Sequence, residues 1–237
     1  MAPEGDDAAV TGDEAPCGRR LRADAEGNRT RLLAAARRVF GRDGVQAPLT
    51  AVADEAGVGI ATLYRRFPDR DALVAEAFGD AVSELDALFA AAREEPDPWI
   101  AFSTLVEGMG DLEARDRGFT HLLQSAALPV RGPASARARG HAAVVDVIAR
   151  GQEAGVLRPD LTPEDLPVLT MAIAGILETT RDDVPDAWRR HVALVLEGCR
   201  ARPDAPPLPR AVPPRDLQRA MIRATRRRTG SADGGRT

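Results

Sequence analysis

The chain of 237 residues is 44% hydrophobic but only 4% aromatic, and it carries a formal net charge of −4. This length allows one large or two small domains with a real hydrophobic core, and the lack of alternating β-branched runs between turn signals indicates an all-α fold. No apolar run approaches the roughly 20 residues of a membrane-spanning helix, and the acidic beginning lacks the basic and apolar segments of a signal peptide. We therefore expect a cytoplasmic protein.

Residues 1–23 are predicted to form a disordered N-terminal arm. The first 18 of them are mostly Asp, Glu, Ala, Gly and Pro, which leave little to bury. Arg19, Arg20 and Arg22 follow directly. This basic cluster has two interpretations: an arm that reaches along a DNA backbone or into a minor groove, or a solvated group of charges.

The first helix is expected to begin at Asn28, a good N-cap residue, and to end at Gly44. Apolar residues between these two recur at helical spacing and predict one buried face, formed by Leu32, Leu33, Ala36, Val39 and Phe40.

Residues 48–70 predict two short helices joined by a tight turn. Pro48 occupies the first helical position, where its missing N–H costs nothing, and Gly57 ends the helix because glycine tolerates positive φ. On the second helix, apolar residues recur at i, i+3, i+4 and i+7, namely Ile60, Leu63, Tyr64 and Phe67. Helices this short are marginal alone, so they must dock on a larger element, as in the helix-turn-helix of DNA-binding proteins.

The charges of the chain are unevenly distributed. Residues 19–70 contain 11 arginines and 6 acidic residues, whereas residues 71–202 contain 13 arginines and 22 acidic residues, and the chain has no lysine. A modestly basic segment therefore precedes an acidic one. Because phosphate attraction needs only a local basic surface, a negative total charge does not exclude DNA binding.

Residues 28–78 resemble the tetracycline-repressor (TetR) family of bacterial transcriptional regulators. The similarity runs without gaps through RTRLLAAARRVFGRDG, LTAVADEAGVG and IATLYRRFPDRDALVAEAF. One departure is at Ala47 and Pro48, where the family often has Ser or Thr. The resemblance implies a three-helix, helix-turn-helix DNA-binding domain at residues 24–70, followed by a larger helical effector-binding and dimerisation domain at residues 71–202.

The resemblance implies that the second short helix enters the major groove with its N-terminal part. Thr62 is then placed to contact a base edge or a thymine methyl, and Gly59 and Ala61 are small enough for close approach, although tight helix packing is an alternative reason for them. Tyr64 and Arg70 match the phosphate contacts of the family. The residues predicted to bind DNA are Thr50, Gly59, Ala61, Thr62, Tyr64, Arg65, Arg66 and Arg70.

One amphipathic helix is predicted from residue 70 to about residue 93, and in the family this helix links the two domains. Asp97 and Pro98 open the next helix, and further helices follow around residues 119–123 and from about 134 to 153. The family places an effector pocket among these helices; ordinary core packing is the alternative for its residues. The predicted pocket lining is Trp99, Phe102, Met109, Phe119, His121, Leu122 and Val144.

The last two long helices, opened by Thr162 with Pro163 and by Pro185, resemble the pair through which family members dimerise. Such a pair packs against its symmetry mate as a four-helix bundle with an isologous interface. The alternative is a monomer that covers both apolar faces internally. The residues predicted to form the dimer interface are Leu169, Ile173, Ile176, Leu177, Trp188, Val192, Val195 and Leu196.

Residues 203–237 are predicted to form a proline-rich linker and a basic C-terminal extension, which the family fold does not require. The segment PDAPPLPRAVPPRD indicates an extended conformation, and residues 214–228 have the pattern of a short basic helix. Disorder is the first expectation for this extension. Packing on its own or on a partner subunit, or added affinity for phosphate, are the alternatives.

These features predict a homodimeric, sequence-specific transcriptional regulator of bacterial type, a repressor released from a palindromic operator by an unknown small-molecule effector, with no membrane partner. The alternative is a helical ligand- or partner-binding protein without operator binding. An enzyme, a cofactor and a metal site are not expected, because no HExxH, paired CxxC or glycine-rich phosphate loop occurs. His121, His141 and His191 are isolated, and Cys17 and Cys199 lie far apart.

Overall fold

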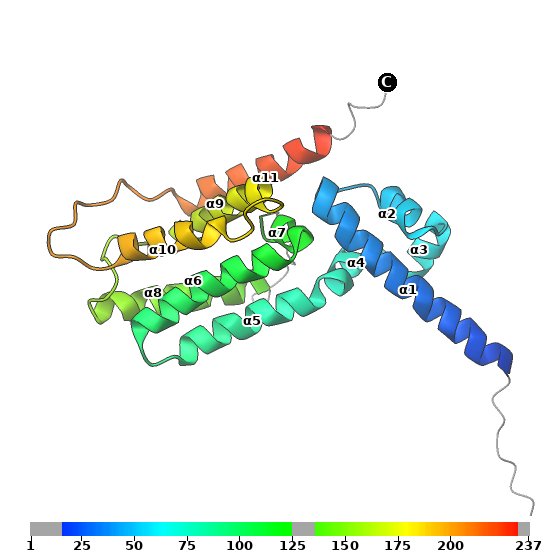
Figure 1. Ribbon diagram of the computed structural model, residues 1–237, viewed down its shortest axis with the longest axis horizontal. Coiled ribbons are helices and arrows are strands. Elements are labelled where there is room, and N and C mark those ends of the chain that lie inside the picture. Colours follow the sequence, from blue (N-terminus) through cyan, green and yellow to red (C-terminus); the bar gives the residue numbers. More distant parts are fainter. Residues whose placement is uncertain (1–15, 125–135, 232–237) are drawn as a thin grey trace, which may run out of the picture.

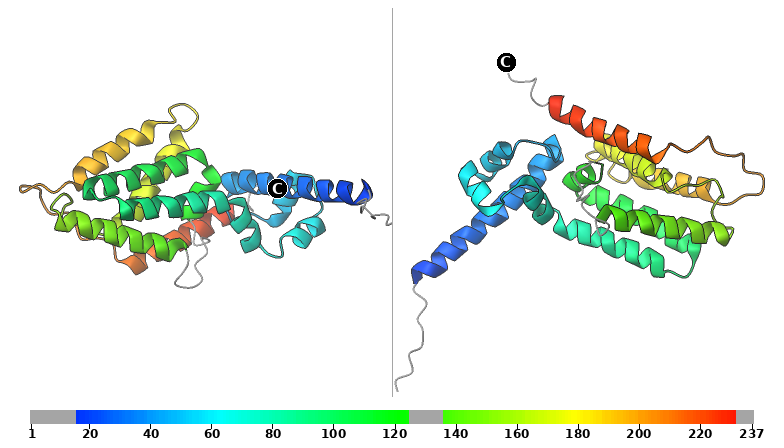
Figure 2. Two further views of the ribbon diagram at one scale, coloured as in Figure 1. Left: turned by 90° about the horizontal axis from the view of Figure 1, so that it is seen from below. Right: turned by 180° about the vertical axis from the view of Figure 1, so that it is seen from behind.

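The computed structural model describes residues 16–124 and 136–231, and within these ranges the chain forms eleven helices and no strand (Figure 1). The fold is all-α, as the sequence predicted. Helices α1–α4 form a smaller group, and α5–α11 form a larger one beside it (Figures 1 and 2). In the described part of the chain, no helix is both long and apolar enough to cross a membrane.

The smaller group is built on α1 (Pro16–Asp43), against which α2 (Leu49–Ala56) and α4 (Arg70–Ala77) pack. Helix α3 (Ile60–Arg66) packs on α2. Each helix turns its apolar side inward, and the shared core is formed by Leu32, Val39, Phe40, Val52, Leu63, Phe67 and Leu73.

The beginning of α1 differs from the prediction. The helix starts at Pro16 and not at Asn28, so it includes residues that were expected to be disordered. Asn28 does not cap the helix; its side chain accepts a hydrogen bond from Arg31, within the same helix. After Pro16 no proline interrupts the run of arginine, leucine and alanine, which are good helix formers. The first part of the predicted arm, residues 1–15, lies outside the described residues.

The predicted helix from residue 70 to residue 93 is in fact two helices, α4 and α5 (Gly79–Glu94), separated at Phe78 with φ −117° and ψ 11°. The ring of Phe78 is fully buried, with its centroid 6.3 Å from that of Phe40 on α1. A Cβ at Gly118 would lie 2.8 Å from its Cζ. The break therefore seats Phe78 in the junction between the two groups of helices, which helical periodicity alone does not reveal.

The larger group is arranged around α6, which contacts α5, α7, α8, α9 and α10. Asp97 caps α6 as predicted, because its carboxylate accepts hydrogen bonds from the N–H groups of Trp99 and Ile100 at 2.8 and 3.0 Å. The remaining bounds are α6 (Pro98–Arg115), α7 (Arg117–Gln124), α8 (Ala136–Glu153), α9 (Asp165–Thr180) and α10 (Ala187–Cys199).

Helices α6 and α10 meet where Gly110 lies beneath the indole of Trp188. The Trp188 side chain is only 1% exposed, and a Cβ at position 110 would lie 2.2 Å from its Cζ3. Glycine is therefore the residue that lets the two helices approach to this distance.

Glu113, one turn further along α6, is fully buried. Arg181, the residue that follows α9, donates to the backbone carbonyl oxygens of Ala114 and Glu113, at 2.5 and 3.2 Å. Among the described residues, the Glu113 carboxyl oxygens have no hydrogen-bond partner. Burial raises the pKa of Glu113 to about 8, although the positive charge of Arg181 acts in the opposite direction.

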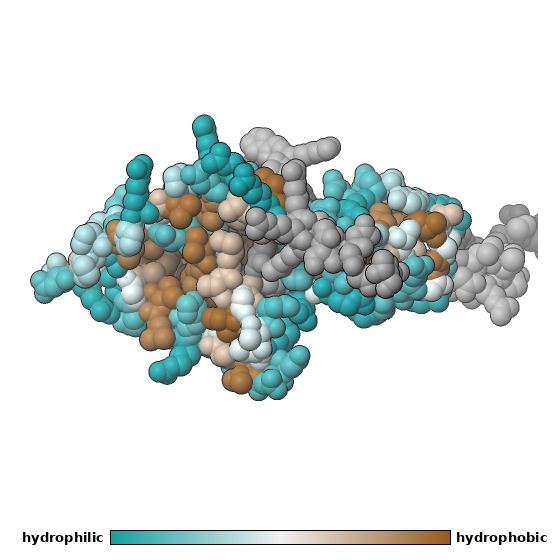
Figure 3. Space-filling view, turned by 90° about the horizontal axis from the view of Figure 1, so that it is seen from above, coloured by the Kyte–Doolittle hydropathy of each residue, from teal (hydrophilic) through white to brown (hydrophobic). Residues whose placement is uncertain are grey.

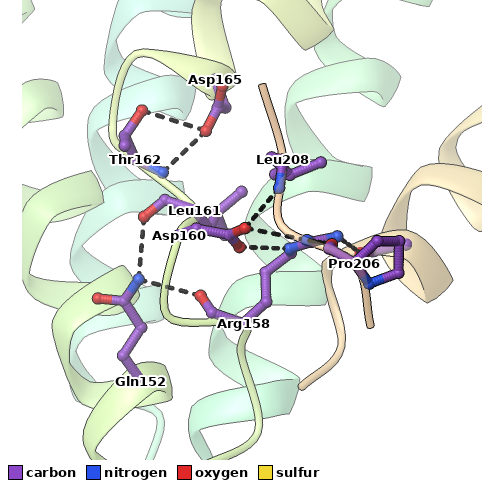
Figure 4. A network of polar contacts seen from close by, with 9 residues as sticks. Gln152, Arg158, Asp160, Leu161, Thr162, Asp165, Pro206 and Leu208 are labelled. Carbon is purple, nitrogen blue, oxygen red and sulfur yellow. Dashed lines mark hydrogen bonds and ion pairs between the residues drawn. The ribbon is translucent and has the colours of Figure 1, made fainter. Parts of the chain in front are cut away.

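After α10 the chain forms a non-helical segment, residues 203–213, which we call the strap, and then α11 (Pro214–Ser231). Arg158 and Asp160 hold the strap (Figure 4): the Arg158 guanidinium donates to the Pro206 carbonyl at 2.8 Å, and the Leu208 N–H donates to the Asp160 carboxylate at 2.7 Å. The expectation of disorder is therefore wrong for α11, which lies along the larger group beside α9 (Figures 1 and 2).

Candidate functional site

A tight turn fixes the direction of α3 relative to α2. Gly57 ends α2 with φ 66° and ψ 36°, and its N–H donates to the carbonyl oxygens of Ala53 and Asp54. The next N–H, of Val58, donates to the Ala53 carbonyl at 3.0 Å. Gly59 is extended and precedes α3. This glycine-capped end is the local signal that the sequence carried, and it orients α3 as in a helix-turn-helix.

Helix α3 has one buried and one exposed side. Leu63 and Phe67 reach the core between α1 and α2, whereas Tyr64 is 52% exposed and Ile60 is also at the surface. Ile60 and Tyr64 therefore do not share the buried face that their spacing predicted. Since α3 has only seven residues, two side chains are sufficient to anchor it.

Most of the residues predicted to bind DNA lie at the surface of α2, the turn and α3. Six of the eight are exposed and Thr62 is half-buried, which leaves it accessible. Arg66 lies 3.8 Å from Glu26 of α1, an exposed ion pair of little energetic weight. The exposed members are Thr50, Gly59, Ala61, Tyr64, Arg65 and Arg66.

Arg70, the eighth residue of this set, has a structural role that the sequence did not reveal. One of its guanidinium nitrogens, Nη1, donates to the carbonyl oxygens of Val45 and Ala47, at 2.8 and 2.7 Å. Partial burial lowers its pKa from the ordinary arginine value. These contacts hold the loop between α1 and α2 against α4. The phosphate contact assigned to Arg70 stays a prediction.

The larger group contains a cavity of about 360 Å³ between α5, α6, α7, α8, α9 and α11. Its walls are mainly apolar, and Leu85, Phe89, Met109, Val144 and Leu166 are among the lining residues. Arg137, Thr170 and Gln218 add polar groups. A cavity of this size and composition is typical of small-molecule sites.

The predicted pocket lining agrees with this cavity only at Met109 and Val144. Trp99 lies at the other end of α6, with the Arg200 guanidinium carbon 3.6 Å from its ring centroid. The Nδ1 atom of His121 lies 3.0 Å from the carbonyl oxygen of Phe40, so this side chain joins α7 to α1. The other three residues belong to the hydrophobic core and are fully buried: Phe102, Phe119 and Leu122.

The lining residues that sequence reasoning missed come from α5, α7, α8, the start of α9 and α11. On α11 these are Leu217, Gln218 and Met221. Leu217 and Met221 are apolar residues of a helix that is otherwise rich in arginine, and nothing in the sequence indicates what they cover. On α8, Arg137 and Gly140 carry no motif and are recognised only from the fold.

The prediction for the dimer interface needs a correction. Five of the eight residues are buried within the subunit itself, which leaves them no surface for a second chain: Ile173, Leu177, Trp188, Val192 and Leu196. The opposite sides of the same helices expose Val168 and Leu194, by 42% and 64%. Ile176 and Val195 are partly exposed beside them, and hydrophobic residues gather over α9 and α10 in Figure 3. We call this surface the α9–α10 face.

The histidine, cysteine and acidic side chains that could bind a metal ion are not clustered in the described residues. In the described part of the chain, no group of three or more His, Cys, Asp or Glu side chains is placed to hold a metal ion. Cys199 is buried, and burial raises the pKa of its thiol to about 11.

Comparisons with known proteins agree with both halves of the fold. Residues 32–77 match the family model "Bacterial regulatory proteins, tetR family", and residues 97–201 match "Transcriptional regulator SbtR-like, C-terminal domain". The chain is 32% identical to a TetR transcriptional regulator from Streptomyces coelicolor of known structure, over 73% of this chain and 98% of that chain, with a TM-score of 0.44.

Two further solved structures have a similar fold at low identity. A gamma-butyrolactone receptor (ArpA like protein) is 16% identical, covering 88% of this chain and 99% of that chain, with a TM-score of 0.55. A TetR family transcription regulator from Marinobacter aquaeolei VT8 is 17% identical, covering 77% and 100%, with a TM-score of 0.54. The comparison with curated proteins gave no match.

Proposed function

Since the chain belongs to the tetR family of bacterial regulatory proteins, we propose that it acts in the cytoplasm as a homodimeric repressor that leaves its operator when a small molecule enters the larger group of helices. The observation that carries this proposal is the exposed side of α3, where Tyr64 and Thr62 lie accessible beside Arg65 and Arg66. A surface of hydroxyl groups and arginines has the chemistry needed to contact both base edges and phosphates.

The two halves of a palindromic operator would be read by two copies of α3. We call the smaller group of helices, α1–α4, the head. Two heads related by a two-fold axis fit half-sites whose centres are about one helical turn, roughly 34 Å, apart. A ligand that prefers the subunit conformation with a different head spacing would release the DNA, because a ligand shifts an equilibrium only by its differential affinity for the two states.

Thr62 and Tyr64 are expected to contribute differently to operator binding. Thr62→Ala should change the preference among single-base variants of the operator by about 1–3 kcal/mol at one position, because a base-edge contact is lost. Tyr64→Phe should weaken binding to all variants alike, by about two- to tenfold, because only a phosphate hydrogen bond is lost. Fluorescence anisotropy with DNA from the chain's own upstream region, at several salt concentrations, measures both effects.

The matched control for this experiment is Thr104→Ala, an exposed threonine on α6 far along the chain from α3. It should leave affinity and preference unchanged. The assignment of α3 as the reader fails if Thr62→Ala and Tyr64→Phe both bind the operator like the parent protein. If the parent protein shows no sequence-specific binding, the chain is a ligand- or partner-binding protein instead.

We place the second subunit on the α9–α10 face. Val168 and Leu194 are large, exposed and apolar, and an added Cβ at Gly175 or Gly198 would meet no atom within 4 Å. Two copies of such a helix pair can approach closely about a two-fold axis and bury the apolar side chains in an isologous interface.

Leu194→Asp is expected to shift the protein from dimer to monomer. A carboxylate at the centre of an apolar interface would be desolvated twice, once in each subunit, and should raise the dimer dissociation constant by a hundredfold or more. Analytical ultracentrifugation over a range of concentrations measures the constant. Leu208→Asp, also an exposed leucine but on the strap, is the control; a dimer that survives Leu194→Asp unchanged would place the interface elsewhere.

A further inference from the structure

One wall of the cavity lies outside both matched family domains. The C-terminal domain match ends at residue 201, and α11 begins at Pro214. Leu217, Gln218 and Met221 of α11 line the cavity. Of the α11 side chains that the structure describes, Leu217 alone is buried. The helix therefore uses its few inward residues to close the cavity.

The strap fixes the place of this wall. Arg158 binds Asp160 through two nitrogens, at 2.5 and 3.0 Å, and the pair binds the strap backbone at Pro206 and Leu208 (Figure 4). The hydrogen bonds from Arg158 and from the Leu208 N–H lower the pKa of Asp160 to about 2, so this carboxylate stays charged at any physiological pH. Because these hydrogen bonds fix the strap, they also fix the position of α11 against the cavity.

The walls facing α11 select for an apolar molecule. Leu85 and Phe89 of α5, Met109 of α6 and Val144 of α8 line the cavity, and their side chains carry no nitrogen or oxygen. A space of about 360 Å³ with such walls suits a drug-sized molecule, whose burial gains roughly 25 cal/mol for each Å² of apolar surface removed from water.

Arg137 adds one positive charge to this apolar environment. It lies in the first turn of α8, lines the cavity, and is half-buried. Burial lowers its pKa from the ordinary arginine value. A guanidinium in such a position gains most from a planar or tetrahedral anion, to which it can donate two hydrogen bonds. Glu164 and His141 also border the cavity, and the experiment below includes a variant of the acid.

We propose that α11 completes the effector site and that this site takes a mainly apolar small molecule whose single anionic group is bound by Arg137. The proposal rests on the function proposed above, because the ligand can act as an effector only if the protein is a ligand-responsive repressor. The binding itself is a separate property and is tested without DNA.

Two fluorescent probes that differ by one charge test the anionic requirement. 8-Anilinonaphthalene-1-sulfonate has an apolar ring system with a sulfonate, and N-phenyl-1-naphthylamine has the same rings without it. For the full-length protein, Arg137→Gln should weaken binding of the sulfonate about tenfold or more and change binding of the neutral probe by less than twofold. Glu164→Gln should leave binding of the sulfonate unchanged or strengthen it, and Arg219→Gln, on the exposed side of α11, should change neither.

The role of α11 is tested with the same two probes. Leu217→Asp and Met221→Gln should each weaken both probes about fivefold or more, because a polar group replaces part of the apolar wall. Circular dichroism melting shows whether each variant folds; Met221→Gln, at a partly exposed position, keeps the test valid if Leu217→Asp does not. If Arg137→Gln lowers the affinities for both probes equally, the anionic requirement is wrong.

Unchanged probe binding in both α11 variants would overturn the claim that α11 belongs to the site. Operator binding of the same preparations, measured in parallel, separates the two proposals. A protein that binds its operator but neither probe contradicts this inference alone, whereas a protein that binds both probes but no DNA contradicts the proposed repressor function alone.

Discussion

Gly110→Ala is expected to lower the free energy of unfolding by about 3 kcal/mol, the upper part of the range for overpacked cores. The new methyl carbon would lie 2.2 Å from Cζ3 and 2.7 Å from Cε3 of Trp188, and the indole is too deeply buried to rotate away. Either α6 and α10 must separate or the ring must leave the core. Urea unfolding followed by tryptophan fluorescence measures the change.

The matched control is Gly27→Ala, in the interior of α1, where a Cβ would meet no atom within 4 Å. It should stabilise the protein slightly, by up to about 1 kcal/mol, because alanine is the better helix former. Trp188→Leu should partly rescue Gly110→Ala, so that the two changes together cost less than the sum of each alone. A Gly110→Ala protein as stable as the parent would contradict the packing of Trp188 on α6.

Glu113 is expected to make the protein less stable as the pH rises. Its pKa in the folded protein is about 8, above the ordinary value of 4.5. Between these two values the folded state keeps the proton and the unfolded state loses it, so unfolding is favoured increasingly as the pH rises through this window. The contribution of this group should fall by up to about 1.4 kcal/mol per pH unit and level off above about pH 8.

Glu113→Gln should remove most of this slope, because glutamine is a neutral isostere of the protonated acid. Thermal and urea unfolding between pH 5 and pH 9 compares the two proteins. Glu107→Gln, an exposed glutamate of the same helix, should leave the slope of the parent protein intact. Parallel curves for the parent and Glu113→Gln would show that Glu113 is already ionised in the folded state.

The sequence predicted those parts of the fold that depend on local signals. Asp97 with Pro98 marked the start of α6, and Gly57 marked the end of α2, because a side-chain cap and a positive φ are properties of a few neighbouring residues. The exposed side of α3 followed from a resemblance that was continuous over the head. These predictions needed no knowledge of what the helices pack against.

Several predictions that differ from the structure depended on which side of a helix faces its own core. Trp188 and Ile173 have the spacing of an interface, but they are buried within the subunit, and the exposed apolar side chain of α10 is Leu194, on the opposite side of the helix. Phe78 continues a helical pattern, yet the chain breaks there to fill the junction. Periodicity identifies an apolar stripe without telling what covers it.

The predicted pocket lining differs from the lining of the cavity for a related reason. Phe102 and Phe119 looked suitable for a pocket, but they fill the core, while a distant segment, α11, supplies a wall through Leu217. No local signal connects residue 217 with α5 or α8. This contact depends on the path of the strap, which brings α11 back to the cavity, and so it is known only from the three-dimensional structure.

Helix α7 has only eight residues, and it contacts both the cavity and helix α1 of the smaller group. Leu123 lines the cavity, while His121, two positions away, lies against the Phe40 carbonyl of α1. Any ligand that displaces α7 must therefore change the environment of the His121 ring. The imidazole resonances of this histidine are a natural spectroscopic reporter, which detects communication between cavity and head in solution without DNA and without an added label.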